Sequence, residues 1–301
     1  MIDSTIIIRI RNVARIQRYN PHSQRHQRQH DAEQDQQHAL NRGWQLTYGG
    51  AFDRAEDHDW QHYAVRQGAV ETEDTDSRLT EYTANLYAGL SKQFRKGSLS
   101  LSLAGEYYRL GDYRDRTLYP QANFVWMPSD RHLVQLSLSS DKRYPAYWEM
   151  QQAVSYIDGY SEIRGTPGLR PSRSYEGQAF YMYRQKYVFM LFWSEEPDYF
   201  IQTGWQASDR LALVYQSLNW NTDRQVGANV IVPFRAGKWL DARLTFTGLY
   251  MKQRCDAFHD ISFDRSKWLG IARMKNTIRL SHKPDPVSYT HLRAHETRSN
   301  L

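Results

Sequence analysis

The chain has 301 residues, enough for two ordinary soluble domains or for one large sheet closed on itself. It is rich in aromatic residues, with 21 Tyr, 11 Phe and 9 Trp, which excludes a disordered chain despite a low mean hydropathy of −0.76. The formal net charge of +6 implies only a weak, general attraction to acidic partners. Because Cys255 is the single cysteine, an intrachain disulfide and a cysteine-based zinc site are excluded.

No segment can cross a bilayer as an α-helix. The longest unbroken apolar run, residues 187–193, is far shorter than the roughly 20 residues that such a helix needs. The first twenty residues also lack the charged segment, apolar core and small-residue cleavage site of a secretory signal. We therefore expect this sequence to begin partway through a longer protein.

Apolar and polar residues alternate with a period of two through most of the chain. The segments in chain order are residues 44–52, 82–90, 99–103, 133–139, 226–234 and 240–250. In the second segment, for example, Leu86, Ala88 and Leu90 share one face and Asn85 lies on the other. This alternation indicates strands with one apolar and one polar face, and no comparable stretch has the period of a helix. The chain is predicted to be all-β.

The predicted connections fall into two length classes. Short ones are expected at residues 94–98, 128–132, 184–186 and 235–238, and long polar ones at 20–42, 54–80, 109–117, 141–172 and 254–266. Short turns on one rim and long loops on the other are typical of transmembrane barrels. We predict that residues 1–285 form roughly a dozen strands of a larger antiparallel transmembrane β-barrel. Residues 286–301 interrupt the strand pattern and are predicted to be a non-native or disordered tail.

Aromatic residues lie near many of the predicted strand ends, where rings of a barrel gather at the membrane interfaces. The alternative is that aromatic residues simply favour strands. The positions are Tyr107, Tyr108, Tyr119, Trp126, Tyr181, Tyr183, Trp193, Tyr199, Trp205, Trp220, Trp239 and Trp268. The difference in loop length favours the aromatic belt.

Three motifs resemble the C-terminal barrel of TonB-dependent outer-membrane receptors, in the outer-membrane protein β-barrel family. They are YPQANF at 119–124 followed by WMPSDRH at 126–132, RYPAYWEM at 143–150, and GTPGLRP at 165–171. The third departs from the family pattern, because Thr166 replaces an Asn and Ser172 stands where a Glu normally follows. The resemblance covers about residues 80–282.

The resemblance implies nutrient uptake across the outer membrane of a Gram-negative bacterium, with this chain as part of the barrel wall. In such receptors a plug domain and an energy-coupling segment precede the barrel and engage an inner-membrane energy-coupling complex. Neither is recognisable here, and the substrate cannot be identified. Outer-membrane lipid and lipopolysaccharide are the expected surroundings. A passive or structural barrel and a soluble secreted β-domain that binds glycans are the alternatives.

A histidine-rich segment is the first candidate for a metal site. In a helix, His22, His26 and His30 would share one face, with His38 nearby, which is a spacing that metal sites use. The interleaved Gln and Arg favour a solvated loop instead. His291 and His295 have the same spacing, but Leu292 stands where the zinc-protease pattern requires Glu.

An acidic stretch is the second candidate, as a loop that could contact a cation or sugar hydroxyls. Its members are Glu56, Asp57, Asp59, Glu71, Glu73, Asp74 and Asp76. A solvated surface is the more common role of such a charge run. No nucleophile motif, glycine-rich phosphate loop or nucleic-acid motif occurs. We therefore predict no catalytic, cofactor-binding or metal-binding residues and no nucleic-acid partner.

Overall fold

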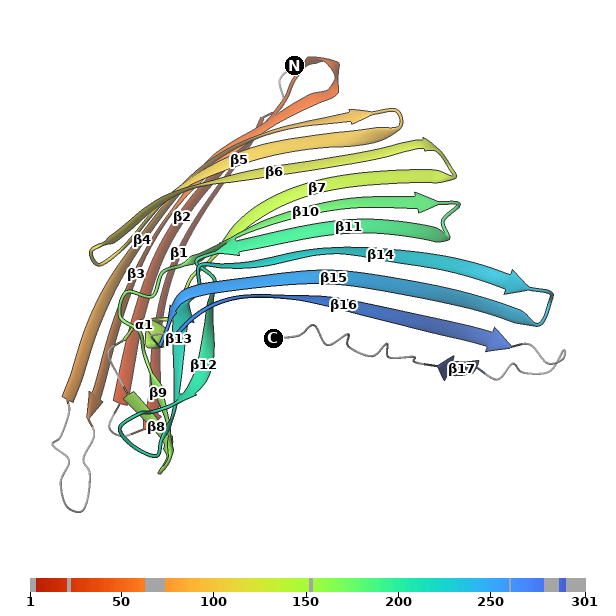
Figure 1. The fold of residues 1–301 in the computed structure, drawn as a ribbon. Helices are drawn as coiled ribbons and strands as arrows, with labels where there is room; N and C mark the ends of the chain where they lie inside the picture. Colours follow the sequence, from red (N-terminus) through yellow and green to blue (C-terminus); the bar gives the residue numbers. More distant parts are fainter. Residues whose placement is uncertain are drawn as a thin grey trace.

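The computed structural model describes residues 4–20, 23–62, 74–151, 154–259, 261–278 and 287–290. In this part of the chain, thirteen strands form one sheet in the order β1-β2-β3-β4-β5-β6-β7-β10-β11-β14-β15-β16-β17, with every neighbouring pair antiparallel. The sheet is strongly curved, and its outermost strands are not paired with each other (Figure 1). This open antiparallel wall confirms the prediction of a partial barrel with roughly a dozen strands.

The wall strands run from 4 to 21 residues in length. Their bounds are β1 Ser4–Asn20, β2 Ser23–Ala39, β3 Trp44–His62, β4 Asp74–Phe94, β5 Gly97–Leu110, β6 Tyr113–Ser129, β7 His132–Arg143, β10 Ser172–Tyr183, β11 Tyr187–Pro197, β14 Thr222–Ala236, β15 Leu240–Phe258, β16 Ile261–Ile278 and β17 Val287–Thr290. The last of these, β17, lies within the predicted tail and pairs with β16.

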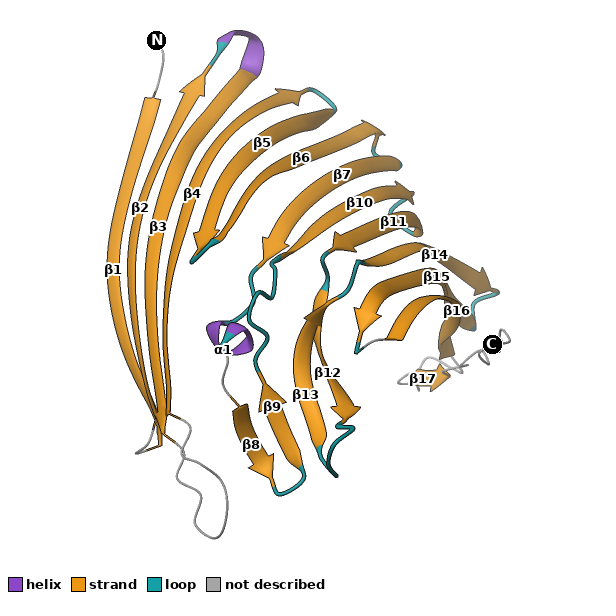
Figure 2. Cartoon of the chain, turned by 60° about the vertical axis from the view of Figure 1, so that its left-hand side comes forward, coloured by secondary structure: helices purple, strands orange, loops and turns teal. Residues whose placement is uncertain are grey.

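A second, smaller sheet is built from the connections that follow β7 and β11. Its strand order is β12-β13-β9-β8, and β9 and β13 run parallel. The bounds are β8 Val154–Asp158, β9 Ser161–Arg164, β12 Phe200–Gln206 and β13 Leu213–Asn219, with one helical turn, α1 Tyr147–Met150, before β8 and a 3-10 turn, η1 Asn41–Gly43, between β2 and β3. Figure 2 shows this loop sheet at one rim of the wall and α1 on the concave side of the curve. Within the described residues, no helix has the length and apolarity needed to cross a membrane.

Strand register joins the apolar faces of separate strands into one surface. Across β4 to β7 the paired positions are Leu90, Leu101, Ala122 and Leu138, while the adjacent row pairs Ser102 with Gln121. Because side chains alternate between faces, a slip of one residue would reverse this arrangement for a whole strand. The sequence alternation and the register therefore agree on one apolar and one polar face.

The predicted turns and loops are confirmed on one rim and partly wrong on the other. Tight turns follow β4, β6, β10 and β14, as expected. The predicted loop 20–42 is wrong, because it contains β2. The predicted loop 109–117 is a tight turn of two residues, and most of the predicted loop 254–266 belongs to β15 and β16. The sequence alternation did not predict these polar strand segments because they lack an apolar face. They are strands because their backbones pair with neighbouring strands.

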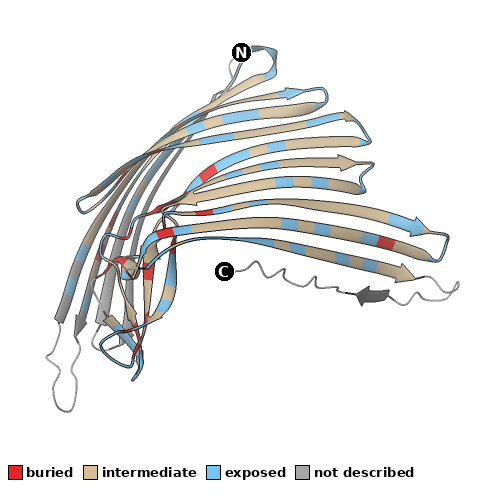
Figure 3. Ribbon diagram, viewed as in Figure 1, coloured by how far each residue is buried: buried red, intermediate tan, exposed pale blue. Residues whose placement is uncertain are grey.

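Buried side chains gather where the wall meets the loops rather than in a central core. Figure 3 shows most of the buried positions near that rim, whereas the wall itself is intermediate or exposed. Residues of the predicted aromatic belt fall into two groups, one exposed on the apolar face and one near the loop rim. Trp126 and Trp268 are exposed on the apolar face, but Tyr108 is 1% exposed on the polar face, and Trp205 and Trp220 belong to the loop sheet and its end.

We expect Leu103→Arg to lower the free energy of unfolding in lipid vesicles by about 2–4 kcal/mol, because Leu103 lies half-exposed in the middle of the face predicted to contact lipid. The matched control is Ser102→Arg, on the polar face of the same strand, with little expected effect. Chemical denaturation of both variants is the measurement. An equal loss in both would show that the faces are wrongly assigned.

Candidate functional site

The most densely interacting polar site lies at the loop rim, between the polar face of β5 and β6 and the rim ends of β7 and β10. Alternation along the strands places Glu106 of β5 and Asp115 of β6 on this face. The regular pairing of β6 with β7 ends at Ala122 and Leu138, and beyond this point Lys142 reaches across to both carboxylates. The site is therefore assembled where the two strands separate.

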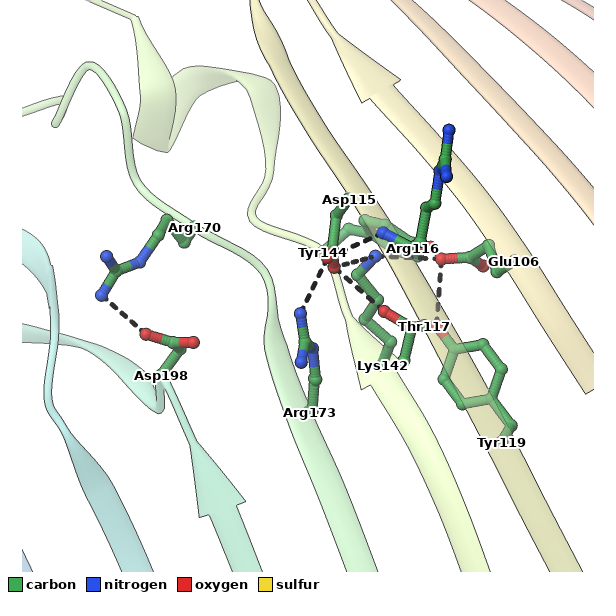
Figure 4. Close-up of polar contacts among 10 residues, drawn as sticks. All are labelled: Glu106, Asp115, Arg116, Thr117, Tyr119, Lys142, Tyr144, Arg170, Arg173 and Asp198. Carbon is green, nitrogen blue, oxygen red and sulfur yellow. Dashed lines mark hydrogen bonds and ion pairs between the residues drawn. The ribbon is translucent and has the colours of Figure 1, made fainter.

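Lys142 is the centre of the site (Figure 4). Its Nζ lies 3.0 Å from Glu106 Oε1 and 3.1 Å from Asp115 Oδ2, and its side chain is only 1% exposed. Arg173 Nη2 lies 2.8 Å from Asp115 Oδ1. Two cations thus balance two carboxylates, which is the condition under which charges can be buried without a large desolvation cost.

Three tyrosines complete the surroundings of the buried cation. Tyr119 donates its hydroxyl to Glu106 Oε1 at 2.9 Å, and the hydroxyl of Tyr144 donates to the same oxygen. The Lys142 Nζ lies 4.7 Å from the ring centre of Tyr108 and 5.1 Å from that of Tyr144. Ring faces attract a desolvated ammonium, so the tyrosines stabilise Lys142 as well as its acceptor.

The segment that contains α1 folds back onto the same polar face. Tyr147 donates its hydroxyl to Glu81 of β4, and Gln151 Nε2 lies 3.5 Å from Asp57 Oδ2 of β3. Met150 of α1 forms a small buried apolar cluster with Leu169 and Phe200. Burial, followed by the charge of Glu81, raises the pKa of the Tyr147 phenol. The phenol therefore stays protonated and keeps donating to the carboxylate.

The GTPGLRP motif connects α1 to the loop sheet. A Cβ on Gly165 would lie 1.8 Å from the carbonyl oxygen of Gln151, so only glycine fits there. Thr166 donates its hydroxyl to the Ser217 carbonyl at 2.6 Å, and its amide donates to the Glu149 carbonyl at 2.6 Å. The motif thus joins the first long loop to β13 of the second.

The loop sheet contains one buried carboxylate with two arginines. Glu162, with a side chain 3% exposed, lies 2.6 Å from Arg164 Nε and 2.6 Å from Arg210 Nη2. The hydrogen bond to Glu162 raises the pKa of Arg210. Because Arg210 lies between β12 and β13 and Glu162 on β9, this ion pair ties the two long connections together.

A hollow of about 290 Å³ lies farther down the polar face, between β7, β10, β11 and β14. Its polar-face lining consists of hydroxyl and amide side chains with one carboxylate and one ring. These residues are Ser137, Ser139, Glu176, Gln178, Phe192, Ser194 and Gln225. Such a surface can exchange hydrogen bonds with a polar solute and stack against an apolar part of it.

The histidine candidates do not come together. His26, His30 and His38 lie on strand β2 rather than on a helix, so neighbouring members are separated by about 13 Å or more at 3.3 Å per residue. His22, His291 and His295 lie outside the described residues. Within the described part of the chain, no group of three or more His, Cys, Asp or Glu is arranged to hold a metal ion.

The acidic candidates are also distributed differently from the prediction of one loop. Glu56, Asp57 and Asp59 lie on β3, and Asp74 and Asp76 on β4, whereas Glu71 and Glu73 lie outside the described residues. Glu56 pairs with Arg54 and Asp76 with His58, while Asp57 is 2% exposed beneath the α1 segment. Strand alternation separates them because successive side chains point to opposite faces.

Sequence reasoning missed the cluster around Lys142. A usable signal was present, because Glu106 interrupts the polar but uncharged face of β5. Its partner could not be identified, since Lys142 follows Glu106 by 36 residues and comes within reach only where β6 and β7 separate.

We expect Lys142→Met to lower the free energy of unfolding by about 3–5 kcal/mol, because Glu106 and Asp115 would stay buried without this cation. Arg170→Met is the control, since its pair with Asp198 is exposed and contributes roughly 1 kcal/mol or less. Denaturant titration of both variants in detergent is the measurement. Similar losses would contradict the central position of Lys142.

We expect Tyr147→Phe to loosen α1 without unfolding the wall, because the hydroxyl that reaches Glu81 is lost. Loss of one charge-assisted hydrogen bond corresponds to roughly tenfold faster amide exchange in residues 147–151. Tyr160→Phe is the control, since that side chain is 66% exposed. Unchanged exchange in the Tyr147 variant would show that the hydroxyl does not hold α1.

Comparison with known proteins relates this fold to a known family and to solved structures. The model of the outer membrane protein beta-barrel family matches residues 4–285. No curated protein matches the sequence significantly. Among solved structures, the chain is similar to a ferric enterobactin receptor of Pseudomonas aeruginosa in complex with enterobactin, with 13% identity, a TM-score of 0.52 and coverage of 93% of this chain and 52% of the receptor.

A second similar structure is the copper transporter OprC, with 10% identity, a TM-score of 0.51 and coverage of 86% of this chain and 50% of the transporter. The chain thus spans about half the length of these proteins, and at this identity the likeness concerns the fold alone. The predicted barrel architecture and outer-membrane location are confirmed by the family match and by the open antiparallel wall. The chain belongs to the outer membrane protein beta-barrel family.

Proposed function

We propose that this chain supplies part of the wall and loop rim of an outer-membrane receptor that takes up a nutrient. The observation that carries the proposal is the ordered rim over a polar concave face, where α1 contacts β3 and β4 and Glu162 ties both long connections together. A simple pore needs a polar interior but does not need contacts that hold its loops in one arrangement. A rim held by buried ion pairs gives a ligand a fixed surface.

Energy coupling belongs to the same proposal. A plug and its contact with an inner-membrane energy-coupling complex would come from residues outside this chain. The solved structures with the same fold include a receptor in complex with enterobactin and a copper transporter. Ferric enterobactin and copper ions are therefore the first ligands to test, followed by vitamins, oligosaccharides and peptides.

We expect that deletion of the encoding gene abolishes uptake of one ligand, and that a protonophore does the same in wild-type cells. Uptake of radiolabelled ligand into whole cells is the measurement. A passive barrel would transport the solute regardless of the membrane potential. A soluble glycan-binding domain would leave every uptake rate unchanged and would remain in solution without detergent.

The polar hollow offers a residue-level test of the same function. We expect Phe192→Ala to raise the ligand concentration for half-maximal uptake by roughly tenfold, because Phe192 lines the hollow on the polar face. Leu191→Ala is the matched control, since the neighbouring Leu191 is 62% exposed on the opposite face. Equal effects of the two substitutions would remove the hollow from the ligand path.

A further inference from the structure

The tip of the β5–β6 hairpin carries three exposed arginines on the apolar face of the wall. Arg109 and Arg114 occupy directly opposite positions on the two strands, and Arg116 lies opposite Tyr107. All three are exposed, and in Figure 4 the Arg116 side chain points away from the cluster around Lys142. We refer to Arg109, Arg114, Arg116 and Tyr107 as the β5–β6 arginine surface.

These cations have no anionic partner among the described residues. Arg109 donates its Nε to the Gly111 carbonyl at 3.2 Å, and Arg116 lies 6.0 Å from the Tyr107 ring centre, but none of the three forms an ion pair with a described carboxylate. Like charges at directly opposite strand positions repel each other. An anion placed between Arg109 and Arg114 would turn this repulsion into attraction.

Farther along the sheet, the cations on this same apolar face form ion pairs. At the loop rim of β14, Arg224 lies 2.7 Å from Glu195 of β11, and Lys252 of β15 lies 3.1 Å from Asp264 of β16. At the loop rim, the β5–β6 hairpin therefore differs from β14 and β15, whose cations on this face are paired. This difference also provides a control position with the same chemistry.

The arginine surface lies directly at the edge of the apolar band. Leu118 follows Arg116 by two residues on the same face and is 63% exposed, and Leu103 beside it is 50% exposed. Two residues of a strand span about 7 Å, so the guanidinium groups stand just above side chains that contact hydrocarbon. A ligand that fits must have both anionic groups and acyl chains.

We propose that the β5–β6 arginine surface binds the phosphate groups of lipid A, the phosphorylated glycolipid of the outer leaflet, with acyl chains against Leu103 and Leu118. Guanidinium groups bind phosphate oxygens through paired hydrogen bonds, and three of them on one hairpin can hold a phosphate between two strands. This site lies on the outer surface of the wall. It requires the outer-membrane location of the chain but not the uptake of any nutrient.

The test is binding of purified bis-phosphorylated lipid A to the detergent-solubilised protein, measured by native mass spectrometry. We expect the triple variant Arg109→Gln, Arg114→Gln and Arg116→Gln to bind lipid A at least tenfold more weakly than wild type. Dephosphorylated lipid A should bind wild type as weakly as the triple variant binds the phosphorylated form. Arg224→Gln, which removes a paired arginine from the same face, should leave binding unchanged.

Two further arms separate the proposal from its alternatives. The triple Arg→Lys variant keeps the charge but loses the paired hydrogen bonds, so it should bind lipid A more weakly than wild type and more tightly than the glutamine variant, which controls for misfolding of the glutamine variant. Inorganic phosphate at the same concentration should not displace lipid A. Equal binding by wild type and the glutamine variant, equal binding of dephosphorylated lipid A, or displacement by inorganic phosphate would each overturn the assignment, whether or not the protein transports a nutrient.

Discussion

Backbone hydrogen bonding is the constraint on which this structure depends. In hydrocarbon every amide and carbonyl group must find its partner within the protein, and an antiparallel sheet provides these partners between neighbouring strands. Once the strands are paired, the period of two decides which side chains meet lipid and which meet the interior. The rows of leucine and alanine across β4 to β7 and the rows of serine and glutamine behind them follow from that single requirement.

The same pairing creates the polar site at the rim. Where β6 and β7 stop pairing, their ends are free to separate, and side chains fill the space that the ladder leaves. Lys142 occupies it with two carboxylates and three tyrosine rings or hydroxyls around it. A charge buried to this extent is tolerated only with such complete pairing, so the surrounding strands and the following loop are held in one arrangement.

Charge is handled in opposite ways on the two faces of the hairpin formed by β5 and β6. Behind the strands, Glu106 and Asp115 are matched by Lys142 and Arg173. On the outer face, Arg109 and Arg114 stand opposite each other without a described carboxylate. The buried cluster must balance its own charges because water is excluded from it, whereas an outer surface can take its counter-charge from the lipid that surrounds it.

The alternation of Leu86, Ala88 and Leu90 with polar residues was enough to predict strands, the apolar face and the barrel class, because side-chain direction in a strand depends only on sequence position. The family motif at residues 165–171 was likewise visible, although only the close approach of Gly165 to Gln151 explains its glycine. Tertiary structure decided the rest. Strand β2 exists because β1 and β3 pair with it, and Lys142 meets Glu106 because two strands diverge. Contacts between distant residues depend on how the strands are paired in space, which local alternation does not specify.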